Sequence, residues 1–125
     1  MNSMARSILF LLSVALSVAS MPATASAAEF GAIAFSTSTG AHGYSHNFKS
    51  RVQAERVALR ACRAYGGGCR VVVYFYNACG ALAVGRRNGY GFGWAPGRGT
   101  AKNIAMAACR QRTSSCRTVR SVCSR

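Results

Sequence analysis

Apolar positions in the first half of the chain change their period twice, which predicts a strand, a helix and a second strand. Residues 30–35 are small and apolar with alternating bulk, which is typical of a strand. Ser50 and Gln53 fit the pattern that caps a helix start, and the following apolar positions recur at helical spacing: Ala54, Val57, Ala58, Ala61 and Tyr65. Residues 69–76 are β-branched and aromatic without alternation, which predicts a central strand.

The same pattern returns in the second half of the chain. At an offset of 47, Ala54, Val57, Ala58, Ala61, Cys62, Cys69, Arg70 and Val72 map onto Ala101, Ile104, Ala105, Ala108, Cys109, Cys116, Arg117 and Val119. Matches at a constant offset indicate a duplicated unit. The second unit predicts a strand over 80–84, a helix capped by Thr100 and a strand over 116–122. We expect the stretches 36–49 and 85–99, rich in Gly and polar residues, to be loops.

Two strand–helix–strand units predict an α+β fold. The simplest packing is one four-stranded antiparallel sheet with both helices on one face. An intertwined arrangement of the same elements around a pseudo-twofold axis is the alternative. Both place residues 28–125 in one domain made of two repeats, about 30–79 and 80–124.

The N-terminal segment has the pattern of a signal peptide. Residues 8–19 form an apolar run that is too short to span a bilayer, and Ala25-Ser26-Ala27 supplies a small-residue cleavage site. We therefore expect residues 1–27 to be removed, although an N-terminal membrane anchor is the alternative. Since no later apolar stretch reaches spanning length, the mature protein is expected in the periplasm or outside the cell.

Six cysteines in a short exported chain predict a disulfide framework. Each repeat has two cysteines seven residues apart, between a helix end and the next strand, and one cysteine is left over in each half. This favours the pairs Cys62–Cys69, Cys109–Cys116 and Cys79–Cys123 out of 15 possible pairings. The spacing is not that of a zinc site, so we expect no metal and no cofactor.

Several short blocks resemble a family of small exported bacterial proteins catalogued as domain of unknown function 4189. The blocks are residues 31–34, 58–62, 69–72 and 77–83, in which cysteine spacing and apolar motifs agree. The resemblance covers roughly residues 30–124. It implies export and a cysteine-containing repeated domain, and it brings no catalytic or binding residues.

The charge of the chain is strongly one-sided. Lys and Arg number 16 against two acidic residues, Glu29 and Glu55, which makes the formal net charge +14. Hydrolysis by paired carboxylates, EF-hand calcium binding and a Ser-His-Asp triad are close to excluded by this composition. Because paired cysteines also leave no free thiol as a nucleophile, we expect no enzyme activity.

The arginines are the first candidate binding residues. Arg56, Arg60 and Arg63 fall on one expected face of the first helix, and Arg86, Arg87 and Arg98 lie in the second Gly-rich stretch. Guanidinium groups suit phosphates and carboxylates, so the expected partner is an anionic polymer or surface, an acidic protein, or nucleic acid without sequence preference. The alternative is that the arginine excess reflects composition and solubility alone.

The second candidate is a segment in which glycine alternates with aromatic residues, with Tyr90, Phe92 and Trp94 at its centre. These rings can stack on sugars or bases, form a protein interface for an inhibitor or effector, or fold back over the sheet. Together with the matching segment around His42, Tyr44 and His46, they form one aromatic and basic surface if the two lie side by side. His42 and His46 are expected to be solvated rather than metal ligands.

Overall fold

The computed structural model describes residues 15, 17–20 and 29–125, so the predicted signal peptide lies almost entirely outside the described residues. The first half contains β1 (Phe30–Phe35), β2 (His42–Phe48), α1 (Arg51–Arg63) and β3 (Arg70–Tyr76). The second half contains β4 (Cys79–Val84), the 3-10 turn η1 (Arg86–Asn88), β5 (Tyr90–Ala95), α2 (Arg98–Arg112) and β6 (Arg117–Cys123). Within the described residues, no helix is long and apolar enough to cross a membrane.

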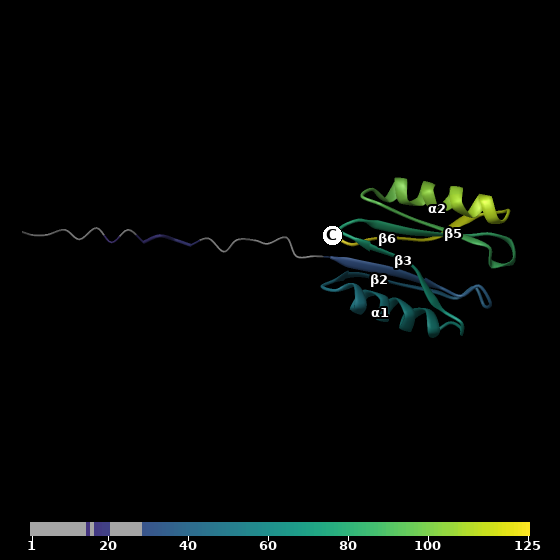
Figure 1. Ribbon diagram of the computed structural model, residues 1–125, viewed down its shortest axis with the longest axis horizontal. Coiled ribbons are helices and arrows are strands. Elements are labelled where there is room, and N and C mark those ends of the chain that lie inside the picture. Colours follow the sequence, from purple (N-terminus) through teal and green to yellow (C-terminus); the bar gives the residue numbers. More distant parts are fainter. Residues whose placement is uncertain (1–14, 16, 21–28) are drawn as a thin grey trace, which may run out of the picture.

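The strands form two three-stranded antiparallel sheets, one from each half of the chain. Their orders are β2-β1-β3 and β5-β4-β6, with β1 and β4 central. The two sheets lie between the two helices, so the layers run α1, first sheet, second sheet, α2 (Figure 1). The halves therefore share one order of elements and one sheet topology.

The expected four-stranded sheet with both helices on one face is wrong. Residues 42–48 and 90–95, which we expected in loops, form β2 and β5 and give each half its own complete sheet. Each helix then covers the outer face of one sheet. The strand over 70–76 is also at an edge rather than central. Its lack of alternation comes from a bulge, because Ile33 pairs with Val73 and Ala34 with Val71.

The core between the two sheets is built from large apolar side chains. Its buried members are Ile33, Phe35, Val73, Phe75, Ala78, Leu82 and Val122. The helices contact the outer faces through alanine instead: Ala54 and Ala58 of α1 pack on Ala32 and Ala34 of β1. The predicted helix start is confirmed, since the Ser50 hydroxyl accepts a hydrogen bond from the Gln53 amide at 3.2 Å. The second helix differs: it begins at Arg98 after Gly97, and Thr100 does not cap it.

Glycine brings the second strand of each half against its helix. A Cβ atom on Gly43 would lie 2.3 Å from the backbone nitrogen of Cys62, and one on Gly91 would lie 2.2 Å from that of Cys109. Real Cβ atoms do not approach backbone this closely, so these positions admit no side chain. The equivalent approach in both halves explains how helix and sheet pack so tightly.

Three disulfides join the elements. They are Cys62–Cys69, Cys109–Cys116 and Cys79–Cys123, the pairs that the cysteine spacing predicts. The first two connect the end of each helix to the strand that follows. The third connects the start of β4 to the end of β6, where the two residues face each other in the strand pairing.

Candidate functional site

The two edges of the sandwich have the same construction and different chemistry. β2 packs beside β6 at one edge, and β3 packs beside β5 at the other. At the first edge, Tyr44 is the strand partner of Ile33 and Arg120 is the partner of Leu82. At the second edge, the corresponding partners are Val73 and Phe92. One edge thus carries a tyrosine and an arginine where the other has a phenylalanine and a valine.

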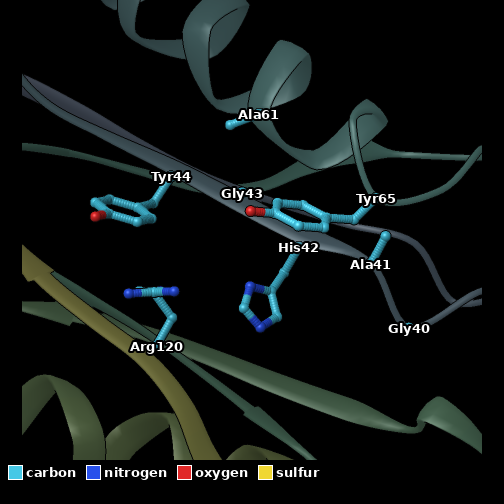
Figure 2. Close-up of a pocket in the computed structure, with 8 residues that line it drawn as sticks. All are labelled: Gly40, Ala41, His42, Gly43, Tyr44, Ala61, Tyr65 and Arg120. Carbon is cyan, nitrogen blue, oxygen red and sulfur yellow. The ribbon is translucent and has the colours of Figure 1, made fainter.

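The first edge holds a cleft of about 500 Å³, lined by Gly40, Ala41, His42, Gly43, Tyr44, Ala61, Tyr65 and Arg120 (Figure 2). The planar groups of Tyr44 and Arg120 lie one above the other on one side, and Tyr65 lies above His42 on the other. Tyr65 follows α1 and is 80% exposed. The volume is in the range of pockets that hold small molecules or single units of a polymer.

Stacking fixes the orientation of the Arg120 guanidinium. Its central carbon lies 4.3 Å from the centre of the Tyr44 ring, and Tyr44 also stacks with His46, with ring centres 6.3 Å apart. Within the described residues, the buried Nε of Arg120 has no hydrogen-bond partner. A guanidinium held by its face presents its N–H donors at its edge, the geometry that binds an oxyanion.

His42 is the second polar group in the cleft without a partner. Its Nδ1 is buried and accepts or donates no hydrogen bond to any residue that the structure describes. Burial lowers the pKa of His42, and the nearby charge of Arg120 lowers it further. The imidazole is therefore held neutral beside a permanent cation.

The depressed pKa of His42 predicts a pH-dependent stability. Its pKa in the folded protein lies below 6.5, so the unfolded chain binds more protons than the folded protein does as the pH falls through that region. We expect the free energy of unfolding to fall between pH 7.5 and pH 5.5, and His42→Gln to reduce this slope. Urea unfolding at a series of pH values measures it. An unchanged slope in the variant would show that His42 titrates normally in the folded state.

The cleft is positive because the acidic residues lie elsewhere. Glu29 pairs with Lys49 at 3.8 Å, and Glu55 pairs with Arg51 one turn earlier on α1. These are the two acidic residues of the whole sequence, and neither lines the cleft. The charge of Arg120 thus has no acidic side chain beside it in the cleft.

The arginines predicted from the sequence do not form one site. Arg56, Arg60 and Arg63 are exposed on α1, and the last two lie in the final turn, where cations stabilise the helix dipole. Arg98, on α2 at the opposite outer layer, donates to the Ser121 carbonyl at 2.9 Å and to its hydroxyl. Arg86 and Arg87 are exposed in η1, at a hairpin tip.

The glycine-aromatic segment is a strand rather than a loop, and it lies at the other edge. Phe92 and Trp94 are 38% and 59% exposed, whereas Tyr90 packs on Phe35 with ring centres 5.3 Å apart. Trp94 borders a hollow of about 250 Å³ together with Tyr74, Phe75 and Tyr76. The expected joint surface with the segment of residues 42–46 does not form, because β2 and β5 lie at opposite edges.

Two residues of the cleft were missed by sequence reasoning, Arg120 and Tyr65. The repeat held a signal for the first. At the offset of 47, Arg120 corresponds to Val73, so a charge replaces an apolar residue within otherwise similar strands. Tyr65 was interpreted as part of the buried helix face. The helix ends at Arg63, which leaves Tyr65 beyond it and exposed.

Comparison with known proteins identifies a family and a solved structure that are similar to this chain. The model of the family described as "Domain of unknown function (DUF4189)" matches residues 30–123. The chain belongs to the DUF4189 family. The NMR structure of Rv1813c from Mycobacterium tuberculosis is similar, with a TM-score of 0.56 and 24% sequence identity over 98% of this chain and 96% of that chain. At this identity the likeness shows the DUF4189 fold alone, and no curated protein matches the chain.

Proposed function

We propose that this DUF4189 protein is an exported cationic binding domain that contacts an anionic partner through the cleft of Figure 2. One observation carries the proposal: the stacked guanidinium of Arg120 has a buried Nε without a hydrogen-bond partner among the described residues, in a cleft that neither Glu29 nor Glu55 lines. A buried cationic donor left unpaired costs free energy. An oxyanion in the cleft would supply the missing acceptor.

Export and the nature of the partner belong to the same proposal. Three disulfides persist in an oxidising compartment, and the pattern of residues 1–27 is that of a signal peptide. The partner is then an anionic polymer or surface of the cell envelope or of the extracellular medium. The domain binds this partner and carries out no reaction on it.

The cleft is favoured over the arginines on α1 as the binding site because Arg120 is stacked and half-buried, whereas the α1 arginines are exposed. Arg56, Arg60 and Arg63 are exposed, so salt screens their charges and their side chains are not held in one orientation. Such residues raise the rate of encounter with any polyanion. Arg120, by contrast, is held by Tyr44 in one plane and is partly shielded from solvent. Discrimination among anions is therefore assigned to Arg120.

Replacing Arg120 by valine, the residue at the equivalent position of the other edge, is expected to weaken binding of an anionic polymer at least tenfold. A hydrogen bond to a charged group contributes about 1.5–3 kcal/mol, which corresponds to this change or more. Calorimetric titration at several salt concentrations against lipopolysaccharide, anionic vesicles, polyglutamate and a neutral glycan measures it. Arg56→Gln removes one exposed charge as the matched control and should change affinity by less than about threefold.

Equal losses in Arg120→Val and Arg56→Gln would contradict the proposal, because affinity would then follow net charge alone. Arg120→Lys keeps the charge without the planar fork, and its affinity should lie between those of the valine variant and the native protein.

Trp94→Ala tests the second candidate, a protein-interaction role of β5, which its 59% exposed tryptophan favours. This variant should leave anion affinity unchanged if the cleft is the site.

A further inference from the structure

The cleft continues past His42 into a second hollow. This hollow has a volume of about 380 Å³ and shares Gly40 and His42 with the first. Its other lining residues include Arg86 and Arg117, both exposed, and the polar side chains of Asn88 and Ser115. His42 therefore stands between Arg120 on one side and two further arginines on the other.

A bulge in β6 brings Arg117 and Arg120 to connected hollows. Leu82 pairs with Arg120 and Ala83 pairs with Thr118, so Val119 is an extra residue. In a regular strand, residues three apart point to opposite faces, and one extra residue reverses this alternation. Arg120 and Arg117 therefore pair with Leu82 and Val84, two residues apart on β4, a span of roughly 7 Å. The two arginines thus leave β6 on the same face and line two hollows that share His42.

We infer that the two hollows form one track for an anionic glycan, a chain whose charged groups recur on alternate rings with an uncharged ring between them. This inference rests on the proposed function. Arg120 takes one anionic group, and Arg117 with Arg86 takes the next. His42, Asn88 and Ser115 offer uncharged hydrogen-bonding groups to the hydroxyls of the intervening ring. The exposed ring of Tyr65 provides an apolar face against which a sugar ring packs.

The track fits single-stranded nucleic acid less well. Binding of such strands uses successive free aromatic faces, on which the bases stack. Here Arg120 covers one face of Tyr44, and the lining of the second hollow includes no Phe, Tyr or Trp. The second hollow therefore offers arginines and hydrogen-bonding groups rather than a stacking platform for a further base.

The test compares an anionic glycan with a nucleic acid of equal charge, a more highly charged small anion and a neutral glycan, all on the disulfide-bonded protein. A hyaluronan hexasaccharide, with one carboxylate on every second ring, is titrated beside an oligothymidylate with three phosphates, tripolyphosphate and a neutral maltohexaose. We expect the hexasaccharide to bind at least tenfold more tightly than each of the other three. Arg117→Ala and Arg120→Val should each weaken it about tenfold. Arg70→Ala, at the position equivalent to Arg117 in the other half, is the matched control and should leave it unchanged.

The outcomes separate this inference from the proposed function. If the oligothymidylate binds as tightly as the hexasaccharide, or if Arg117→Ala leaves hexasaccharide affinity unchanged while Arg120→Val lowers it, the glycan track is wrong and anion binding at the cleft stands. If Arg120→Val changes the affinity for none of the anions, the proposed function itself fails. Thermal unfolding of each variant establishes that the fold is retained.

Discussion

Gly91→Ala is expected to destabilise the protein by about 3 kcal/mol, and Gly43→Ala by a similar amount. The added methyl group would lie 2.2 Å from the backbone nitrogen of Cys109 in the first case and 2.3 Å from that of Cys62 in the second. These neighbours are backbone atoms of a helix, so no side chain can turn away to make room. Relief requires the helix to move off the sheet, which costs the packing of its alanine face.

Gly99→Ala is the matched control for these variants. Gly99 lies in the first turn of α2, and an added Cβ there meets no atom within 4 Å. Alanine favours a helix over glycine by about 0.5–1 kcal/mol, so this variant should be slightly more stable than the native protein. Urea unfolding without reductant, which keeps the disulfides intact, measures all three. A loss below about 1 kcal/mol in Gly91→Ala would show that α2 shifts on its sheet at little cost.

The same close approach explains why β2 and β5 could not be predicted from the sequence. Strands are expected to bury large residues and expose small or polar ones. In β5, Gly91, Gly93 and Ala95 are buried against α2, whereas Phe92 and Trp94 are exposed. In β2, Gly43 and Ser45 take the buried positions. Large and small residues do alternate in both segments, but here the small ones are buried and the large ones exposed. The sequence pattern was therefore interpreted as a loop.

Other parts of the fold could be predicted because their signals are local. The strand over 30–35 and the helix after Ser50 are confirmed, since apolar periodicity and a capping hydroxyl specify them within a few residues. The stacking of the two sheets, by contrast, is not specified by residues that are close in sequence. It depends on how the edges of distant segments meet, and no short pattern encodes it. The single-sheet prediction failed at this level.

The candidate site was predictable only in part for the same reason. Tyr44 and Arg120 are far apart in sequence and belong to different sheets, and the stacking of the edges brings them together. The bulge that aligns Arg117 with the neighbouring hollow also has no marker in the sequence of residues 117–123. The positive charge of the chain was evident from its composition. The composition did not indicate which arginine is held in one orientation.

Replacing Cys79 and Cys123 together by alanine is expected to lower the free energy of unfolding by about 4 kcal/mol. The disulfide closes a loop with a sequence separation of 44, which restricts the unfolded chain more than a short loop does. It also ties the start of β4, the central strand of the second sheet, to the end of β6. Chemical unfolding of the double variant without reductant, beside the native protein, measures the loss.

The other two disulfides provide the control, because their cysteines have matching environments. Each pair combines one buried and one half-buried cysteine, so the packing lost on substitution is similar. Each closes a separation of 7, for which the expected loss is about 2.5 kcal/mol. Equal losses for all three pairs would rule out loop length as the cause. Since β6 carries Arg117 and Arg120, a drop in anion affinity confined to the Cys79–Cys123 variant would further indicate that the cleft depends on β6 being held in register.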